Sequence, residues 1–367
     1  MKKIAPRTLA PGDTIGILGG GQLGRMLAIA AARLGLKTIV LEPGKQCPAA
    51  QTCNRHIVAA YDDNAALGEL AQNCAVVTYE FENIPNIAVQ FLEAKIPLLP
   101  NTFALEKSQD RLSEKKFLNE IGIATAPFAA INAAEDLVHE AGKPGFAGIL
   151  KTRRLGYDGK GQTKISDKDS AESLVKAWQA VGRQPCVLET FINFNKEISV
   201  IAARSIKGEI VCFDPAQNVH RDGILHTSTV PAEISDKTLR RAGDIAAEIL
   251  NALDYVGVIG VEFFVLDDGE LLVNEIAPRV HNSGHWTEAA CAVSQFEQHI
   301  RAISGWPLGD GKRHSNCVME NLIGDDIKRF AALLREPELH LHLYGKAEVN
   351  PGRKMGHFTR LSSPQRG

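Results

Sequence analysis

The chain has 367 residues, and at roughly 100 to 200 residues per domain this length predicts two or three domains. A formal net charge of -2 and a pI of about 6.6 provide no basic field, so neither nucleic acid nor an anionic membrane is an expected partner. The seven cysteines are scattered without a C-x-x-C pair, and no apolar run approaches the ~18 residues of a membrane span. These features favour a protein of the reducing cytoplasm.

The first hundred residues alternate between two kinds of pattern. Short apolar runs are separated by stretches of helical periodicity, which predicts a parallel sheet covered by helices. We therefore expect a Rossmann-like domain over residues 1–105. Its strands are predicted at residues 14–18, 37–42, 55–60, 74–80 and 97–100.

A glycine fingerprint follows the first predicted strand. Gly19, Gly21 and Gly24 have the G-x-G-x-x-G spacing, and Glu42 closes the next apolar run about 20 residues later. This arrangement is typical of NAD-binding enzymes. The spacing itself requires only a tight turn and a helix whose free N–H groups face an anion. An NAD-dependent oxidoreductase is thus one interpretation of this segment, and not the only one.

The pattern changes after residue 105. Residues 105–122 are charged with helical periodicity and connect to a region of strands and turns that reaches residue 305, typical of an α+β domain. The last part of the chain alternates polar and apolar residues around a turn at 350–352. We predict an α/β and α+β protein with domains at 1–105, 106–305 and 306–367, the second including a glycine-rich subdomain at about 123–190.

Two acidic residues are predicted to face each other across a hairpin. Two apolar runs flank residues 268–269, an Asp-Gly pair that favours a two-residue loop. With that loop, Asp267 faces Glu270, and Glu262 lies opposite Glu275, with Cβ atoms roughly 5 Å apart. Such a pair suits Mg²⁺ or a shared proton, whereas a solvated hairpin face is the alternative without function.

The segment KTRRLGYDGKGQ, residues 151–162, has features of a phosphate-binding loop. Lys151 ends an apolar strand, and Gly156, Gly159 and Gly161 let backbone amides approach an anion. The segment does not match the Walker pattern G-x-x-x-x-G-K-[ST]. By itself, its glycine content slightly favours an ordinary charged surface loop. In combination with the acid pair it favours magnesium and a nucleotide.

These features together resemble the ATP-grasp ligases and, among them, the family of N5-carboxyaminoimidazole ribonucleotide synthetases of purine biosynthesis. The resemblance extends over nearly the whole chain and rests on GGGQLGRM, YEFENIP, GYDGKGQ, DPAQNVHRDGILHTS, NEIAPRVHNSGHWT and YGKAEVNPGRKMGH. It implies an ATP-grasp fold: a Rossmann-like domain, a central ATP-binding α+β region and a small β-rich C-terminal subdomain. The chain stops at RLSSPQRG, earlier than this pattern predicts, so the end is either naturally short or missing.

The resemblance implies ATP as co-substrate. The phosphates would contact Arg111 and Lys151 beneath the loop 156–162, adenine would bind along residues 189–192, and Glu197 and His220 would complete the nucleotide pocket. The implied ATP-binding residues are Arg111, Lys151, Gly156, Tyr157, Asp158, Gly159, Lys160, Gly161, Gln162, Glu189, Thr190, Phe191, Ile192, Glu197, His220, Asn274 and Glu275.

The resemblance also implies Mg²⁺ bound by Glu262 and Glu275, with Asn274 beside them. Many ATP-grasp enzymes have an asparagine ligand two residues after the second glutamate, where this chain has Ala277. We therefore expect two protein ligands, with water and phosphate oxygens completing the coordination.

The second substrate implied by the resemblance is 5-aminoimidazole ribonucleotide. Lys346 and Arg353 lie on either side of the Pro-Gly turn, where two cations can meet one phosphate. Glu80 is expected at the ribose. The implied substrate-binding residues are Gln22, Leu23, Glu80, Asp158, Lys160, Arg279, His281, Asn282, Lys346 and Arg353.

The implied reaction is the attack of bicarbonate on the γ-phosphate of ATP, followed by carboxylation of the amine through carboxyphosphate. We expect Lys151 to neutralise charge on the phosphoryl group, Arg279 to stabilise carboxyphosphate, and Asp158 to orient or deprotonate the amine. Related ligases, such as a formate-dependent transformylase or a biotin carboxylase, are the alternatives within the superfamily. A homodimer and a transient hand-over of product to the mutase that follows are also implied.

Overall fold

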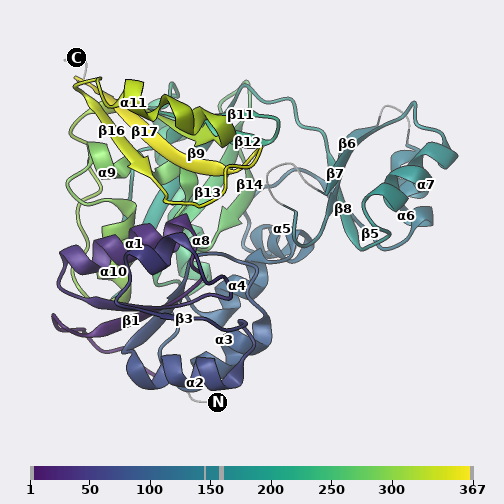
Figure 1. Cartoon of the computed structure of the whole chain (residues 1–367). Coiled ribbons are helices and arrows are strands. Elements are labelled where there is room, and N and C mark those ends of the chain that lie inside the picture. Colours follow the sequence, from purple (N-terminus) through teal and green to yellow (C-terminus); the bar gives the residue numbers. More distant parts are fainter. Residues whose placement is uncertain (1–3, 144–145, 157–160, 364–367) are drawn as a thin grey trace.

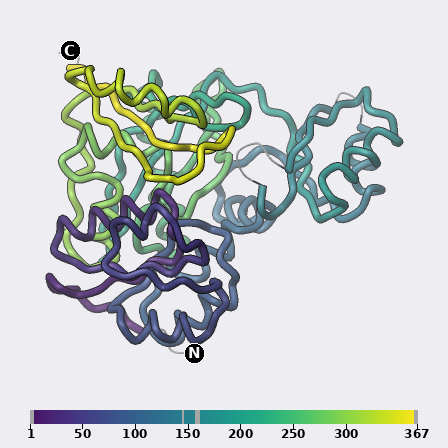
Figure 2. The backbone as a smooth tube through the Cα atoms, in the orientation of Figure 1, coloured from purple at the N-terminus to yellow at the C-terminus, as the bar shows by residue number. Residues whose placement is uncertain are grey.

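The computed structural model describes residues 4–143, 146–156 and 161–363, and three sheets organise them (Figure 1). A parallel sheet forms the N-terminal domain, and a large antiparallel sheet spans the rest of the main body. The third sheet, with two helices, forms an arm that projects from that body (Figure 2). The Rossmann-like and ATP-grasp-like architecture predicted from the sequence is therefore present.

The N-terminal sheet has four parallel strands in the order β3-β2-β1-β4. They and their helices are β1 (Thr14–Leu18), α1 (Gln22–Arg33), β2 (Lys37–Leu41), the 3-10 helix η1 (Pro48–Gln51), β3 (Arg55–Ile57), α2 (Asn64–Asn73), β4 (Val76–Tyr79) and α3 (Asn86–Glu93). The fifth strand predicted at 97–100 forms only an isolated bridge between Val77 and Leu98. Pro97 and Pro100 have no N–H to donate, which limits this segment to a single bridge.

The arm is a self-contained unit. Its antiparallel sheet has the order β5-β8-β6-β7, and its two helices share with it a separate apolar core that includes Leu137, Leu150 and Leu174. The elements are β5 (Phe128–Ile131), α6 (Ala134–Ala141), β6 (Ala147–Thr152), β7 (Gln162–Ser166), α7 (Ala171–Ala180) and β8 (Cys186–Thr190). Two helices, α4 (Thr102–Ser108) and α5 (Arg111–Glu120), connect the N-terminal domain to this arm.

The large sheet has nine strands, eight of them in the order β14-β13-β9-β11-β12-β15-β17-β16, while β10 pairs with β9. The strands are β9 (Lys196–Arg204), β10 (Ile210–Cys212), β11 (Ala216–Arg221), β12 (Ile224–Val230), β13 (Gly257–Val265), β14 (Leu271–Ala277), β15 (Asn316–Ile323), β16 (Leu339–Leu343) and β17 (Lys354–Ser362). Because β15 pairs with β12, the sheet continues across the domain boundary expected at residue 305.

Helices cover both the sheet and its connections. They are α8 (Asp236–Ala252), the 3-10 helix η2 (Asn282–Gly284), α9 (Thr287–Ala290), α10 (Gln295–Ile303), the 3-10 helix η3 (Gly324–Arg329) and α11 (Phe330–Leu333). One core cluster joins α1 to α10 and to the large sheet, through residues such as Leu27, Ile300 and Trp286. The N-terminal domain therefore packs directly against the central sheet.

The β13–β14 hairpin differs from the prediction in its loop. Leu266 donates its N–H to the Glu270 carbonyl, so three residues form the loop rather than two, and Gly269 has a φ of 82°. This loop shifts the register by one residue. A bulge between Glu262 and Phe263 shifts it back, so Glu262 does pair with Glu275. The predicted pairing is confirmed, but its geometric reason was wrong.

We predict that Asn101→Ala destabilises the junction between α4 and the end of α8. The buried Asn101 amide donates to the carbonyls of Leu253 and Asp254, and its oxygen accepts from the Ala104 N–H at 2.9 Å. Loss of these bonds should lower the apparent free energy of unfolding by about 3 kcal/mol. Asn73→Ala, which removes one exposed hydrogen bond, is the control. In urea denaturation it should change the apparent free energy of unfolding by less than about 0.5 kcal/mol. Equal effects would contradict the prediction.

Candidate active site

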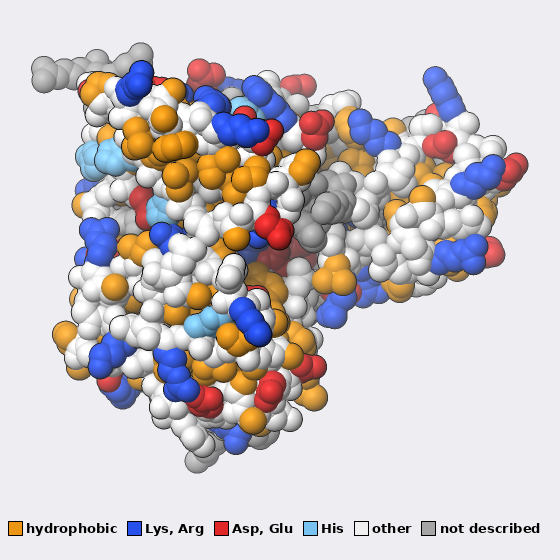
Figure 3. Space-filling model, in the orientation of Figure 1, with side chains coloured by type: hydrophobic (Ala, Val, Ile, Leu, Met, Phe, Trp, Pro, Cys, Tyr) orange, Lys and Arg blue, Asp and Glu red, His pale blue; other side chains and the backbone are white. Residues whose placement is uncertain are grey.

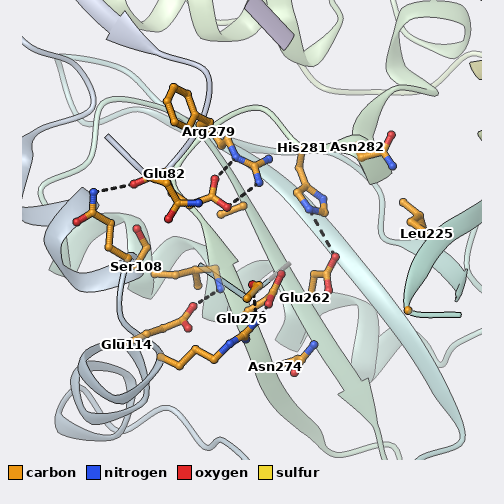
Figure 4. A pocket seen from close by; sticks show the side chains of 18 of the residues that line it. Glu82, Ser108, Glu114, Leu225, Glu262, Asn274, Glu275, Arg279, His281 and Asn282 are labelled. Atoms are coloured by element: carbon orange, nitrogen blue, oxygen red, sulfur yellow. Dashed lines mark hydrogen bonds and ion pairs between the residues drawn. The ribbon is translucent and has the colours of Figure 1, made fainter. Parts of the chain in front are cut away.

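A cavity of about 570 Å³ lies where the N-terminal domain, α5, the arm and the β13–β14 hairpin meet. This volume is typical of a site for a small molecule. Acidic side chains are visible in the hollow between the arm and the main body (Figure 3). In the close view, side chains from several elements point toward one another across the cavity (Figure 4).

The cavity brings together residues that are distant in the sequence, from Gln22 to Lys354. Of the residues expected in the site, it is lined by Gln22, Leu23, Glu80, Arg111, Lys151, Gly156, Gln162, Glu197, His220, Glu262, Asn274, Glu275, Arg279, His281 and Asn282. It is not lined by Gly161, Glu189, Thr190, Phe191, Ile192, Lys346 or Arg353. The expected residues Tyr157, Asp158, Gly159 and Lys160 lie outside the described residues.

The two hairpin acids form the acidic centre of the cavity. Burial and the nearby charge of Glu275 together raise the pKa of Glu262 to about 7. Asn274 is the extra residue of the bulge beside them. The bulge therefore allows two carboxylates to share one side of the hairpin, where a cation would relieve their repulsion.

A buried chain of hydrogen bonds orients the histidine next to Glu262. Burial lowers the pKa of His281 to about 3, so its imidazole is neutral. The Ser283 N–H donates to its Nδ1, which leaves the proton on Nε2, 3.6 Å from Glu262. Beyond Ser283 the chain continues through Ser199, Asn218 and Ser228, with donor–acceptor distances of 2.7 to 2.9 Å.

Helix α5 begins at the cavity and directs Arg111 into it. Asp110 caps the helix by accepting from the N–H groups of Leu112 and Ser113. Arg111 then contacts Glu275 at 3.2 Å and donates to the Gly156 carbonyl at 3.1 Å. The first residue of the capped helix thus places its guanidinium between the hairpin acids and the start of the glycine-rich loop.

Two lysines share one buried carboxylate on the arm side of the site. Lys151 lies 3.0 Å and Lys115 3.3 Å from Glu189 Oε2. Burial opposes ionisation of Glu189, but the charges of the two lysines lower its pKa below the usual value. One carboxylate thus holds two ammonium groups in place, which leaves an excess of positive charge for an anion.

Glu114 and Lys115 were not identified from the sequence. Glu114 is buried and accepts from the Ile276 N–H at 2.5 Å, and Lys115 is 1% exposed. Both follow Arg111 at helical spacings of three and four residues, which places all three on one helix face. Their spacing from Arg111, a predicted phosphate-binding residue, is the sequence signal from which Glu114 and Lys115 could have been predicted as site residues.

Glu82 and Arg279 form a bidentate ion pair at the edge of the cavity, with N···O distances of 2.5 and 3.2 Å. Burial alone would raise the pKa of Glu82, but Arg279 holds it at about 2. The Arg279 Nη1 also donates to the Val280 carbonyl. The Arg279 guanidinium has five N–H groups. Three of them donate to Glu82 and Val280, so two do not contact these partners.

The glycine fingerprint binds carboxylates of the protein itself. Glu80 accepts from the N–H groups of Gly21 and Gly24, and Glu42 accepts from Gly20 at 2.9 Å. Burial raises the pKa of Glu80, which the two glycine N–H groups partly offset. The amides that would face a dinucleotide phosphate are therefore already used. A role for Glu80 at a ribose stays a prediction.

Two further groups of expected residues have defined partners. Glu197 and His220 lie on neighbouring strands and form an ion pair. Burial would lower the pKa of His220, but Glu197 raises it above the usual value. On the arm, the N–H groups of Thr190 and Phe191 already donate to carbonyls of Pro127 and Ala147. Their role toward adenine stays a prediction.

The basic residues on either side of the C-terminal turn donate hydrogen bonds to nearby backbone carbonyls. Lys346 Nζ donates to the Lys354 carbonyl at 2.6 Å, and Arg353 Nη1 donates to the Glu348 carbonyl at 3.1 Å. Lys354, which was not identified from the sequence, lines the cavity. It begins the strand directly after Arg353. A role for Lys346 and Arg353 at the substrate phosphate stays a prediction.

Comparisons with known proteins agree along the whole chain. Family models match for the ribonucleotide synthetase preATP-grasp domain at residues 13–109, the ATP-grasp domain at 116–296 and the phosphoribosylaminoimidazole carboxylase C-terminal domain at 317–366. An N5-carboxyaminoimidazole ribonucleotide synthase of Brucella melitensis is 60% identical over 354 residues, covering 96% of this chain and 98% of that protein. The chain belongs to the N5-carboxyaminoimidazole ribonucleotide synthase family.

Solved members of this family have the same fold. A synthetase in complex with ADP has a TM-score of 0.92 at 42% identity, covering 97% of this chain and 94% of that one. A synthase of Aspergillus clavatus in complex with ADP and 5-aminoimidazole ribonucleotide has a TM-score of 0.88 at 31% identity, covering 96% and 94%. The resemblance to ATP-grasp ligases is confirmed, and the oxidoreductase interpretation of the fingerprint is not supported. No helix among the described residues could cross a membrane.

We predict that Glu114→Gln flattens the dependence of stability on pH. Burial and the charge of Glu275 raise the pKa of Glu114 from 4.5 to about 8, so between these values the folded state holds a proton that the unfolded state has lost. The free energy of unfolding should therefore fall as pH rises, by up to about 1.4 kcal/mol per pH unit from this group. The glutamine variant keeps an oxygen for the Ile276 N–H and should lose this slope in urea denaturation.

The control for this experiment is Glu120→Gln, at the exposed end of the same helix. It should leave the pH profile as in the wild type. A Glu114→Gln profile with the wild-type slope would show that Glu114 is ionised in the folded protein at neutral pH.

Proposed function

We propose that this cavity carboxylates 5-aminoimidazole ribonucleotide at its exocyclic amine, using ATP and bicarbonate and releasing ADP and phosphate. The observation that carries the proposal is the meeting of the Glu262–Glu275 pair with two lysines around Glu189 beside one cavity. Acids that suit a divalent cation and lysines that suit phosphates are what phosphoryl transfer from ATP requires. Membership of the family, with a relative solved with ADP and 5-aminoimidazole ribonucleotide, supports these substrates.

The hairpin acids fit Mg²⁺. They are hard oxygen donors, and the raised pKa of Glu262 reflects first its burial and then repulsion from Glu275, which a divalent cation would relieve. Glu262 and Glu275 would hold the ion, with waters and phosphate oxygens completing its coordination. Bound there, Mg²⁺ would neutralise charge on the transferring phosphoryl group.

ATP would enter with its phosphates between α5 and the arm. Lys151, held by Glu189, and Arg111, held by Glu275, are positioned toward that space before the nucleotide arrives. Because both cations are already fixed, little side-chain reorganisation is needed as charge develops during phosphoryl transfer. The Glu197–His220 pair would face the ribose of the nucleotide.

The carboxyl group would be transferred on the opposite side of the cavity. A bicarbonate oxygen attacks the γ-phosphorus and ADP leaves, which gives carboxyphosphate. The substrate amine then attacks the carboxyl carbon, phosphate leaves, and the amine loses a proton. Arg279, with two N–H groups free of its Glu82 and Val280 partners, would bind the carboxyl oxygens, and neutral His281 and Asn282 line the same side.

We further propose that the protein acts in the cytoplasm, where its seven free cysteines would stay reduced. A homodimer and transfer of the product to the following mutase are additional proposals that rest on the resemblance.

The proposed function is tested by measuring ATP hydrolysis with each substrate omitted in turn. Release of ADP should require Mg²⁺, bicarbonate and 5-aminoimidazole ribonucleotide together. Activity that depends on formate and glycinamide ribonucleotide, or on biotin, would instead identify a related ATP-grasp ligase. Hydrolysis that is independent of the ribonucleotide would contradict the proposal.

We predict that Glu262→Gln and Glu275→Gln each lower kcat by on the order of 100-fold or more, because each removes charge from the metal site. Raising the Mg²⁺ concentration should restore part of the activity. Glu270→Gln is the matched control, since Glu270 lies on the same hairpin but is exposed and pairs with Lys237 at 3.0 Å. It should keep wild-type kcat. Wild-type kcat and Mg²⁺ dependence in both cavity variants would rule out the assigned metal site.

A further inference from the structure

A second group of potential metal ligands lies away from the cavity, between α9 and the C-terminal strands. His342 on β16 pairs directly with His357 on β17, and their rings stack with centroids 5.3 Å apart and an interplanar angle of 14°. Glu288 of α9 reaches both rings, and one ligand atom from each of the three residues lies within 4.8 Å of the others. None of the three residues lines the cavity described above.

We propose that Glu288, His342 and His357 form a binding site for a divalent transition metal ion of the zinc class. Two imidazole nitrogens and one carboxylate oxygen are a ligand set that zinc accepts, with a water at the fourth position. Mg²⁺ prefers oxygen ligands and would not compete well for this set.

The distances fit this ion better than they fit hydrogen bonds. Glu288 Oε2 lies 3.3 Å from His342 Nδ1 and 3.9 Å from His357 Nε2. The first distance is at the long end for a hydrogen bond and the second is beyond it. Two ligands bound tetrahedrally at about 2.0 to 2.1 Å from zinc are about 3.4 Å apart, close to the Glu288–His342 distance, and the three ligand atoms already lie within 4.8 Å of one another.

The surroundings of His357 prepare it as a ligand. Its Nδ1 forms a 2.9 Å hydrogen bond with the Tyr344 hydroxyl, which fixes the ring and leaves Nε2 directed toward Glu288. A partner on the second ring nitrogen is typical of histidines that bind metals.

A neighbouring histidine adds an independent observation. The His285 ring lies 4.7 Å from the His357 ring, and its Nε2 is buried with no hydrogen-bond partner among the described residues. An unsatisfied buried nitrogen is costly, and a metal-bound water would be a polar partner next to this cluster.

The ion would join two parts of the fold. Glu288 belongs to the segment that follows His281 and Asn282 of the cavity, whereas both histidines belong to the C-terminal strands. We therefore expect the ion to stabilise the docking of β16 and β17 against α9. Its role is structural, and it takes no part in the carboxylation itself.

The test uses full-length, tag-free protein that has been stripped with a chelator and returned to excess Mg²⁺, so that the cavity acids are occupied. Titration with Co²⁺ should give one site with the visible absorption of four- or five-coordinate cobalt and no thiolate charge-transfer band. Zn²⁺ should displace the cobalt and raise Tm by several degrees. A wild-type protein with no such absorption would overturn the proposal.

Variants then locate the ion. His342→Gln and Glu288→Gln should each weaken Co²⁺ binding by at least about tenfold and abolish the gain in Tm. His340→Gln, on the same strand but outside the cluster, is the matched control and should bind like the wild type. Because Glu288 is partly exposed, Glu288→Gln should fold, and its Co²⁺ affinity can be measured even if His342→Gln fails to fold. Unchanged binding in Glu288→Gln would overturn the assignment.

Discussion

The approach of Glu262 to Glu275 is the constraint around which the candidate site is arranged. Two carboxylates paired across a hairpin repel each other, and burial makes that repulsion expensive, as the raised pKa of Glu262 reflects. A neighbouring cation and a neighbouring N–H group are placed to oppose it. Arg111 contacts Glu275, while the neutral His281 directs its Nε2 toward Glu262. In the proposed function, a divalent cation bound between the two carboxylates would relieve this repulsion.

On both sides of the hairpin, acids of the protein also hold the cations in place. Glu189 holds Lys115 and Lys151 on the arm side, and Glu82 holds Arg279 on the opposite side, so each cation is fixed by an acid of the protein. Such preorganised charge is effective in phosphoryl transfer because it needs no rearrangement as the reaction proceeds. The fold supplies the rigid supports: the capped helix α5, the bulged hairpin and the packed N-terminal domain.

Much of this could be predicted from the sequence where the signal is local. The alternation of the first hundred residues predicted a parallel sheet of five strands, of which four form, because buried strands and their covering helices have different periods. The pairing of the two acids was predicted correctly although both the loop length and the bulge were missed. The three-residue loop shifts the register by one residue, and the bulge shifts it back by one, so the two errors cancel. Neither the length of this loop nor the bulge can be recognised from a single sequence.

Contacts between distant segments were the least predictable part. The fingerprint amides bind Glu80 and Glu42 rather than a ligand, and Glu82 is paired with Arg279 almost two hundred residues away. These partners are set by how the domains pack, which periodicity does not report. Glu114 and Lys115 are different, because their spacing from Arg111 on one helix was visible and its meaning depended only on recognising Arg111 as a site residue.

The most direct test of the account follows the oxygen atoms of bicarbonate. If a bicarbonate oxygen attacks the γ-phosphate of ATP in this cavity, then reaction with ¹⁸O-labelled bicarbonate must leave one labelled oxygen in the phosphate that is released. The account predicts this transfer, measured by mass spectrometry or by the isotope shift in ³¹P NMR, and only when 5-aminoimidazole ribonucleotide is present. Unlabelled phosphate accompanying a carboxylated product would contradict it.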